Sequence, residues 1–377
     1  MNSPRNPTLI FILLLLSACS YLHFQSFSSE ILQDSMVPLK QLPFNSSFSL
    51  IPCFGFLHSL PPLNSSSENL TDIFLIDPAA IRKLLKNCRI SLSLPLSVMI
   101  PKQKAEIDIN VYNVTFFTDK GDYLQLNSQP ERVLLKQDYQ RIGPLLVPVD
   151  LQKFLEFYDR SRFIPCLNLD MRRTDTGRRL PENFENKLAL VRDALIVFGA
   201  FPFLHGGTLL GWYRECSIIP HTFDGDFAVL RREYRPQMHD HLKSQSGFRL
   251  SRRLGREYDS LEFTVKTGFR TGAPIDIFIL YDQDDNRVYS HGLHTATGRR
   301  VKYIYPRARG FCSGILGGKL FFVPCNAEET IAADYGTQWA KDHPTSSYNW
   351  MKSGANVVDN GVFTKEEMKM LVYESNL

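Results

Sequence analysis

Two aspartates, Asp224 and Asp226, stand two positions apart at the start of an apolar run that ends at Leu230. Side chains alternate between the two faces of a β-strand, so we expect both carboxylates to point the same way and Phe227 and Val229 to point the other. Like charges held side by side need a countercharge, and a divalent cation is the usual one. The pair therefore predicts a metal-binding strand.

A third carboxylate, Asp276, lies within the apolar stretch 274–280. Burying an aspartate as an anion costs free energy unless it is ion-paired or binds a metal. Alone, Asp276 is equally well explained as a core acid in a salt bridge. With Asp224 and Asp226 it forms a set of strand-borne acids of the kind that hold Mg²⁺ or Mn²⁺ against phosphate oxygens in phosphoryl transfer.

A diglycine turn, Gly206-Gly207, follows the expected strand 201–205 and precedes an expected short helix ending near Arg214. Glycines let the backbone approach a phosphate closely, and free N–H groups at a helix start favour anionic oxygens. An isolated pair of glycines would be explained as a plain strand-to-helix turn. The acids downstream favour the phosphate site, and the residues together predict a metal-dependent transferase acting on a nucleotide-linked phosphate.

An amphipathic helix is expected just before this turn, because apolar residues recur at helical spacing between Pro181 and Gly199. The periodic residues are Phe184, Leu188, Val191, Leu195 and Phe198. We expect this stripe to pack under the strand 201–205. The polar, glycine-containing segment 170–179 marks a domain boundary.

The first half of the chain carries no catalytic constellation. Residues 25–70 are rich in Ser, Pro and Asn and are interpreted as a stem. From residue 71 onward the pattern predicts a small α/β domain, with strands at 73–77, 105–112 and 114–117 and helices at 78–86 and 151–157.

The amino terminus contains an apolar run from Thr8 to Cys19 that continues to Phe24, with Arg5 before it. This length is near the lower limit of about 17 residues for a membrane span. A signal-anchor over residues 8–24 with a lumenal remainder is favoured over a cleaved signal peptide, which would leave a secreted or ER-lumenal protein. A third interpretation, a bacterial lipoprotein box that would place a lipid on Cys19, is disfavoured by the glycosylation sequons.

Four N-x-S/T sequons lie between this run and the diglycine turn, at Asn45, Asn64, Asn69 and Asn113. Their clustering suggests a glycosylated lumenal stem and first domain. Beyond Cys19 the cysteines are Cys53, Cys88, Cys166, Cys216, Cys312 and Cys325. An oxidising compartment would allow up to three disulfides of undetermined pairing. No CxxC spacing occurs, which argues against a thiolate zinc site, and no base is paired with Cys216 as a nucleophile.

Composition excludes other classes of protein. The 377 residues are 44% hydrophobic and 22% charged, which is ordinary globular composition. The formal net charge is only +4, so no nucleic-acid partner is expected.

Several blocks in the second half resemble the fukutin branch of the LicD-like nucleotidyltransferase-fold proteins. The matching blocks are 207–214, 218–220 with Asp224-x-Asp226, 275–278, and 323–326 with 333–336 and Trp339. They follow the family's order between about Pro181 and Val357. The sequence departs from the family pattern at two places. His221-Thr-Phe precedes Asp224 where LicD relatives tend to have acidic residues, and Gly225 stands between the acids in place of a branched apolar residue.

The resemblance implies a polymerase-β-like nucleotidyltransferase fold and a Golgi membrane protein, single-pass with a lumenal catalytic domain. The implied reaction moves ribitol 5-phosphate, or a related phospho-alditol, from a CDP-activated donor to a protein-linked O-mannosyl glycan. Golgi co-transferases would be the partners of the protein. By motif, Asp224 and Asp226 would bind Mg²⁺ or Mn²⁺, and Asp276 would bind metal or activate the acceptor hydroxyl. Gly206, Gly207 and Thr208 would line the donor phosphates.

By the same resemblance, Arg214 would bind the diphosphate of the donor. In the alternative interpretation, Arg214 is a cation at the helix C-terminus that interacts with the helix dipole.

Two other functions stay open: an Asp-x-Asp glycosyltransferase using a sugar nucleotide, and a non-catalytic Golgi scaffold. The expected organisation is an α/β protein with a cytosolic tail at 1–7, the anchor at 8–24, the stem at 25–70, an α/β domain at 71–175 and the catalytic domain at 176–377.

Secondary candidates surround these blocks. Two basic clusters, Arg252, Arg253 and Arg256 and then Arg299, Arg300 and Lys302, could bind a phosphorylated acceptor but are more simply solvated charges. His205 and His221 could assist proton transfer or act by hydrogen bonding. Asn326 and Glu329 predict a capping box for a helix ending at Gly336. Tyr335 and Trp339 are interpreted as packing residues, with base stacking the alternative.

Overall fold

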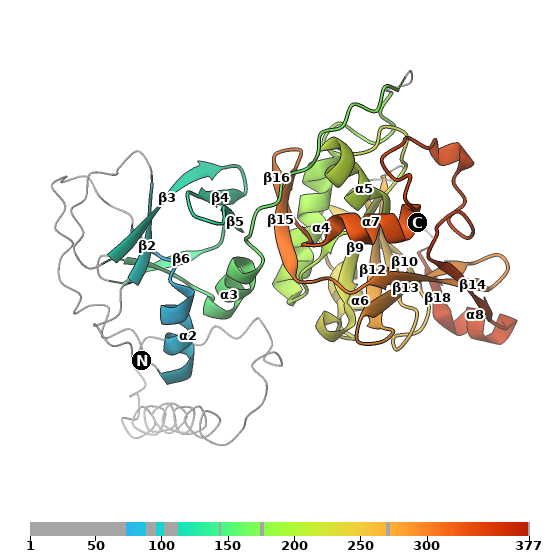
Figure 1. Cartoon of the computed structure of the whole chain (residues 1–377). Helices are drawn as coiled ribbons and strands as arrows, with labels where there is room; N and C mark the ends of the chain where they lie inside the picture. Colours follow the sequence, from blue (N-terminus) through green and yellow to red (C-terminus); the bar gives the residue numbers. More distant parts are fainter. Residues whose placement is uncertain are drawn as a thin grey trace, which may run out of the picture. The chain divides into compact units, whose positions relative to one another are not determined.

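The structure is a computed structural model that describes residues 73–87, 96–101, 112–142, 145–173, 177–268 and 272–375. Its strands form two sheets (Figure 1). The first has the order β5-β4-β3-β2-β1-β7-β6. Its elements are β1 (Ile73–Leu75), α2 (Pro78–Asn87), β2 (Leu96–Pro101), β3 (Tyr112–Lys120), β4 (Tyr123–Leu126), β5 (Arg132–Leu135), β6 (Tyr139–Ile142), β7 (Leu145–Pro148) and α3 (Leu151–Asp159).

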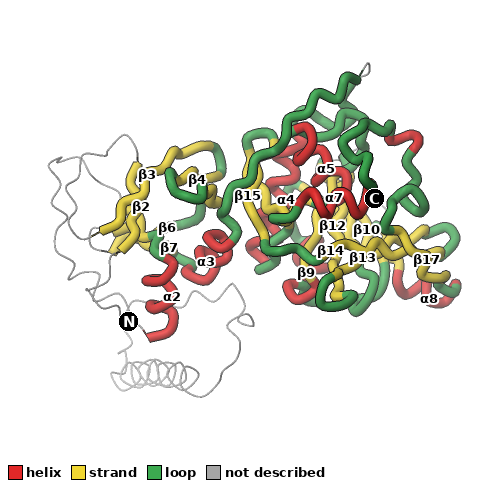
Figure 2. Tube along the Cα trace, viewed as in Figure 1, coloured by secondary structure: helices red, strands yellow, loops and turns green. Residues whose placement is uncertain are grey.

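The second sheet runs β15-β16-β8-β9-β12-β11-β10-β18, and the strands β13, β14 and β17 extend from β12. Helices lie beside these strands (Figure 2). The elements are α4 (Phe184–Phe198), β8 (Phe203–Leu204), α5 (Gly206–Glu215), β9 (Gly225–Leu230), η5 (Arg231–Glu233), α6 (Met238–Lys243), β10 (Phe248–Leu254), β11 (Glu262–Thr267), β12 (Pro274–Asp282), β13 (Arg287–His294), β14 (Arg299–Pro306), β15 (Phe311–Leu316), β16 (Lys319–Pro324), α7 (Ala327–Tyr335), η6 (Thr345–Ser347), β17 (Val357–Val362), α8 (Lys365–Leu371) and β18 (Val372–Glu374).

The amphipathic helix predicted from spacing is α4. Phe184, Leu188, Val191 and Leu195 are all fully buried, and Gly199 ends the helix in a left-handed conformation (φ 93°) that glycine adopts without steric cost. The stripe packs on β16 and reaches β9, rather than lying only under the short strand β8.

The two faces of the second sheet differ in character. One face is apolar and contributes to the hydrophobic core, with Phe227 and Val229 from β9 and Ile275 and Ile277 from β12. The prediction that these β9 residues point away from the acids is thus confirmed. On the other face α7 contacts α5 and β14, and the acids lie on this side.

Several predictions fall outside the described residues. These are the tail, the 8–24 segment, the stem, the strand at 105–111, the sequons at Asn45, Asn64 and Asn69, and Cys53 and Cys88. Asn113 lies in β3. Among the helices of the described part, none is long and apolar enough to cross a membrane.

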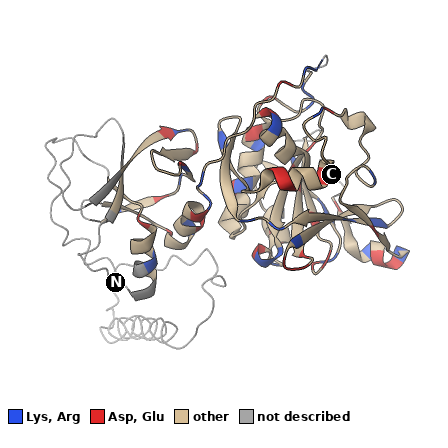
Figure 3. Ribbon diagram, in the orientation of Figure 1, with Lys and Arg blue, Asp and Glu red and all other residues tan. Residues whose placement is uncertain are grey.

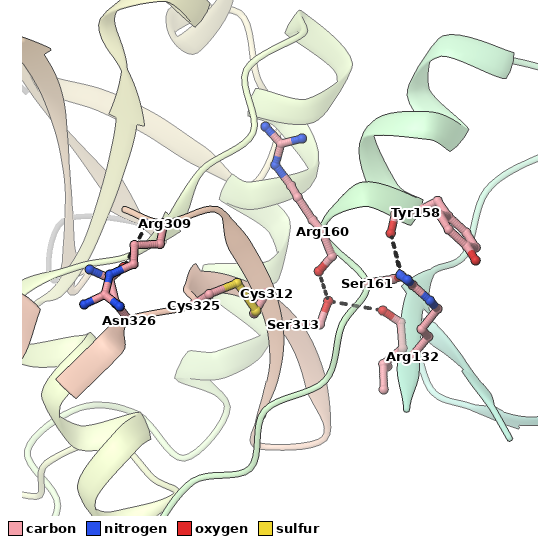
Figure 4. Close-up of a disulfide and its surroundings, with 10 residues drawn as sticks. Arg132, Tyr158, Arg160, Ser161, Arg309, Cys312, Ser313, Cys325 and Asn326 are labelled. Atoms are coloured by element: carbon pink, nitrogen blue, oxygen red, sulfur yellow. Dashed lines mark hydrogen bonds between the residues drawn. A yellow bond between two sulfur atoms is a disulfide. The ribbon is translucent and has the colours of Figure 1, made fainter. Parts of the chain in front are cut away.

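Two disulfides join cysteines of the described chain: Cys166 with Cys216, and Cys312 with Cys325. The first ties the segment after α3 to the end of α5, which excludes Cys216 as a free thiol. The second bridges β15 to the residue after β16 (Figure 4).

The segment that follows α3 runs alongside β15 (Figure 4). Ser313 on β15 is fully buried, and its hydroxyl lies within hydrogen-bonding distance of the carbonyl oxygens of Arg160 (2.9 Å) and Val133 (3.1 Å). Its backbone N–H donates to the carbonyl of Arg162. Ser313 therefore links β5 and the segment after α3 to the second sheet.

Candidate active site

The three predicted acids converge. Carboxylate oxygens of Asp224, Asp226 and Asp276 lie within 4.8 Å of one another. Asp226 and Asp276 are register partners on the parallel strands β9 and β12, so their side chains share one face of the sheet. Asp224 immediately precedes β9, and the hydroxyl of Thr222 donates a hydrogen bond of 3.0 Å to its carboxylate.

The electrostatics show that these acids lack sufficient countercharge. Burial raises the pKa of Asp226 well above its usual value, and the neighbouring Asp224 and Asp276 raise it further. Burial likewise raises the pKa of Asp276 to about 6, against a hydrogen bond from Thr264 that lowers it. A divalent cation would remove the repulsion that raises these pKa values.

This oxygen-only donor set fits a hard divalent cation. Mg²⁺ and Mn²⁺ prefer carboxylate and water oxygens, and three converging carboxylates supply them without any nitrogen or sulfur ligand. The residues that would hold the metal are thus the ones predicted from the sequence.

The diglycine turn lies directly against Asp226. Gly206 has a positive φ of 48°, and a Cβ added there would come within 3.0 Å of the Asp226 Oδ2 atom. A Cβ on Gly207 would lie 3.6 Å from the same oxygen. Glycine is therefore needed at position 206 for both the backbone conformation and the space beside the acid, whereas the contact at position 207 is an ordinary one. The first N–H groups of α5, which have no acceptor within the helix, begin at this point.

Thr208 supports the acid strand through its side chain. Its Oγ1 atom accepts a 2.8 Å hydrogen bond from the backbone N–H of Asp226, and the residue is only 4% exposed. The hydroxyl therefore holds the strand as an acceptor, and its O–H proton can still be donated to a phosphate oxygen.

Packing against α4 explains the glycine at position 225. It points to the core face, and a Cβ there would approach Phe184 to 2.8 Å and Leu188 to 2.9 Å. This close approach of α4 to β9 explains the glycine at this position.

Arg214 is placed differently from its expected role at the diphosphate. It is 2% exposed and forms ion pairs with Glu215 and, at 3.6 Å, with Asp342. Its guanidinium also donates to the carbonyls of Trp339 and Lys341, both at 3.1 Å. These partners make Arg214 a structural cation near the end of α5, so a donor-phosphate role is not supported.

Asp334 is a site residue that sequence reasoning missed. It lies on α7, is 5% exposed, and accepts a 3.3 Å hydrogen bond from the hydroxyl of Tyr305. Burial raises its pKa to about 7, and its charge raises the pKa of Asp226. The signal was present, because Asp334 belongs to the block 333–336 that resembles the family.

Neither histidine side chain forms a hydrogen bond with the three acids among the described residues. His205 is 3% exposed among the rings of Phe203, Phe278 and Tyr305, and burial lowers its pKa to about 4. It is therefore neutral at physiological pH. His221 lies within hydrogen-bonding distance of Thr345 (2.7 Å) and Asp342 (3.3 Å).

A cavity of about 410 Å³, here called the Phe223 pocket, is lined by residues from the segments before α4 and before β9 and from the loop around Asp342. Its lining includes Arg172, Arg179, His221 and Phe223, and Phe223 directly precedes Asp224. Phe223 is 55% exposed, and the Arg179 guanidinium lies 5.1 Å from its ring centre. Neither Arg172 nor Arg179 forms an ion pair with a residue that the structure describes. Their charges are thus available to an anion.

The first basic cluster contributes one residue to the site, Arg252, because Arg253 pairs with Glu257 and Arg256 with Asp259. In the second cluster Arg299 pairs with Asp359, while Arg300 and Lys302 cover the rings of Phe363 and Tyr289. Charged residues of both signs mix over the rest of the chain (Figure 3).

The predicted capping box at α7 is wrong. The Asn326 side chain makes no cap hydrogen bond; it accepts from the backbone N–H of Arg309 and donates to Glu329 instead. Trp339 packs on Tyr213, as expected of a packing residue. Tyr335 reaches the glycine turn, since its hydroxyl lies 3.8 Å from a Cβ placed on Gly207.

Comparison with known proteins agrees with this geometry. Residues 199–326 match the LicD/FKTN/FKRP nucleotidyltransferase domain, and residues 62–165 match the W02B3.4-like N-terminal domain. The chain is 35% identical to the uncharacterized protein W02B3.4 of Caenorhabditis elegans over 334 residues, covering 85% of this chain and 84% of that protein. The chain belongs to the fukutin-like LicD family.

More distant members of the fukutin-like LicD family carry a named activity. The ribitol-5-phosphate transferase FKTN of Mus musculus is 29% identical over 232 residues, 59% of this chain and 49% of that protein. The human FKTN protein is 28% identical over the same length. The chain thus spans about half the length of these transferases. The matched LicD/FKTN/FKRP domain, residues 199–326, contains the glycine turn and the three acids. Similarity at this distance suggests a transferase of the LicD type.

Proposed function

We propose that this protein transfers a phospho-alditol, ribitol 5-phosphate or a close relative, from a CDP-activated donor to a hydroxyl of a protein-linked O-mannosyl glycan. The observation that carries the proposal is the convergence of Asp224, Asp226 and Asp276 beside the Gly206-Gly207 turn. The named activity of the FKTN relatives supports the choice of substrate.

In the proposed reaction the acceptor hydroxyl oxygen forms a bond to the phosphorus that carries the alditol. The phosphoanhydride bond to that phosphorus breaks, and its electron pair leaves with CMP. The hydroxyl proton passes to a carboxylate oxygen of the site and then to water. A Mg²⁺ or Mn²⁺ ion held by the three acids would neutralise the charge on the phosphate oxygens.

The residues of the chain position the donor. The N-terminal turn of α5 at Gly206 and Gly207 offers backbone N–H groups next to Asp226, a favourable place for phosphate oxygens. The Phe223 pocket suits the nucleotide end, because Phe223 offers an exposed ring for stacking and Arg172 and Arg179 offer positive charge.

For localisation we propose a single-pass Golgi membrane protein anchored by residues 8–24, with the catalytic domain in the lumen. The apolar run, the clustered sequons and the disulfides Cys166–Cys216 and Cys312–Cys325 support an oxidising, glycosylating compartment. Co-transferases of the same glycan are the proposed partners.

The test is CMP release from CDP-ribitol by the purified full chain, with Mg²⁺ or with EDTA, and with an O-mannosyl glycopeptide as acceptor. We expect metal-dependent release that Asp224→Asn abolishes and Glu257→Gln, which lies away from the acids, does not. Release of the nucleotide from a sugar nucleotide, with no release of CMP from CDP-ribitol, would favour the glycosyltransferase alternative. Absence of release from every donor would favour the scaffold.

A further inference from the structure

A row of polar residues crosses the sheet beyond the three acids. Asp226 on β9 pairs in register with Asp276 on β12, Asp276 with Thr264 on β11, and Thr264 with Arg252 on β10. The Thr264 hydroxyl donates a 2.5 Å hydrogen bond to Asp276, and Arg252 donates one of 3.2 Å to Thr264. The Arg252 guanidinium lies 3.9 Å from Asp276, and its side chain is 37% exposed.

Glu262 lies on the same face, two positions before Thr264 on β11. It is 8% exposed, yet within the described chain no hydrogen bond or close ion pair involves its carboxylate. Its charged neighbours are Asp276, which raises its pKa, and Arg252, which lowers it, while burial is the main cause that brings the pKa to about 8. Its oxygens are not among the fully buried, unsatisfied side-chain atoms of the described residues, so they keep some exposure and can accept a hydrogen bond from a ligand.

The position of Glu262 relative to the donor site is informative. In the strand order, the glycine turn lies between β8 and β9, whereas Glu262 and Arg252 lie on β11 and β10. Asp276 on β12 separates the two sides. In an in-line displacement the attacking hydroxyl and the leaving group lie on opposite sides of the phosphorus. With the leaving CMP on the side of the glycine turn, in-line attack brings the acceptor from the β11 side.

The surroundings suit a polyhydroxylated acceptor. A carboxyl group and a guanidinium can both hydrogen-bond neighbouring hydroxyls of one sugar ring. Tyr303 on β14 borders the same region, since both Glu262 and Asp226 raise its pKa, although burial is the main cause. Tyr303 is only 9% exposed, and its hydroxyl donates a 3.0 Å hydrogen bond to the carbonyl of Trp350, so it is a fixed part of the wall of this region.

We propose that Glu262 and Arg252 form the acceptor subsite, where they hydrogen-bond hydroxyl groups of the acceptor sugar and direct one of them to the phosphorus. The proposal rests on the proposed function, because it assumes a sugar acceptor. It assigns these two residues to binding and leaves metal coordination to the three aspartates.

The test compares Glu262→Gln and Arg252→Gln with the controls Glu257→Gln and Arg253→Gln. Arg253 is adjacent to Arg252 but points to the opposite face and pairs with Glu257. Calorimetry on the full chain would measure the Kd of a synthetic O-mannosyl glycopeptide, and kinetics would measure its KM. We expect the two site variants to weaken acceptor binding at least about tenfold, as the loss of one charged hydrogen bond implies.

The Kd of CDP-ribitol should change less than about twofold in the same variants, because neither side chain lies at the glycine turn or lines the Phe223 pocket. Unchanged acceptor binding, a loss confined to metal or donor, or an equal loss in the controls would overturn the proposal. Failure of the wild type to bind the glycopeptide would overturn it too. Failure of the proposed function is distinct: it would appear as absent CMP release in the wild type, while glycopeptide binding would still test the subsite.

Discussion

Asp226 and Asp276 stand opposite each other in register on the parallel strands β9 and β12. Their carboxylates therefore meet on one face, although a long stretch of sequence with four other elements separates them. The core face of the same strands, with Phe227 and Ile277, holds this register, because a slip of one residue would turn the acids into the core.

The first prediction concerns metal binding. Asp226→Asn keeps the shape of the side chain but removes one carboxylate charge from the cluster. We expect Mn²⁺ affinity to fall at least about tenfold and turnover about a hundredfold or more, because the cation neutralises the transferred phosphate. Calorimetry and CMP release measure these effects, and Asp193→Asn on the exposed side of α4 is the control. Wild-type metal affinity in Asp226→Asn would contradict the assignment.

The second prediction concerns pH. Burial raises the pKa of Asp276 to about 6 and that of Asp334 to about 7, whereas the unfolded chain loses these protons near pH 4. The metal-free protein should therefore lose stability as the pH rises from about 4 to 7. Because the cation binds ionised carboxylates, Mg²⁺ should raise Tm more at about pH 8 than at about pH 5.

Thermal unfolding with Mg²⁺ or EDTA across this pH range measures both effects. An Asp276→Asn variant, which cannot titrate there, should show a smaller pH dependence of the metal-free Tm. Equal Mg²⁺ shifts at both pH values would contradict the picture of uncompensated acids.

The third prediction separates two arginines. Arg214→Met leaves Glu215 and Asp342 with a buried charge that has lost a partner, so we expect a loss of about 3–5 kcal/mol of stability. The KM for CDP-ribitol of the folded protein should stay the same. Arg179→Met in the Phe223 pocket should do the opposite, raising the donor KM with little change in Tm. A raised donor KM in Arg214→Met at unchanged stability would restore the original expectation.

The fourth prediction concerns the glycine between the acids. Gly225→Val places methyl groups where a Cβ alone would lie 2.8 Å from Phe184, so we expect a loss of about 1–3 kcal/mol. Phe184→Leu in the same chain should recover part of this loss. Chemical denaturation of the two single variants and the double variant measures the coupling. Purely additive losses would show that α4 does not pack on β9 at this point.

The sequence predicted the parts of the site that local pattern encodes. Two acids at strand spacing and an acid within an apolar run are visible in the chain itself, and so is the helix that Gly199 ends. The glycines at 206 and 207 were predicted to let the backbone approach a phosphate, and that role stays a prediction. Their contact with Asp226 needed the structure.

What local pattern could not give was cross-strand partnership. Glu262 and Thr264 reach the site only through the antiparallel register of β11 and β12, which no spacing along the chain reveals. Asp334 arrives from α7. The predicted role of Arg214 was wrong because a permanent cation near a glycine turn suggests a phosphate-binding residue. Its actual partner Asp342 lies far away in the sequence, so the pairing was not visible there.

The most direct measurement of the central claim is mass spectrometry of the acceptor after incubation with the full chain, CDP-ribitol and Mg²⁺. The account predicts that an O-mannosyl glycopeptide gains the mass of one ribitol phosphate, that EDTA prevents the gain, and that Asp224→Asn and Asp226→Asn prevent it at unchanged folding. An unmodified glycopeptide with wild-type protein, or equal modification by the variants, would contradict it.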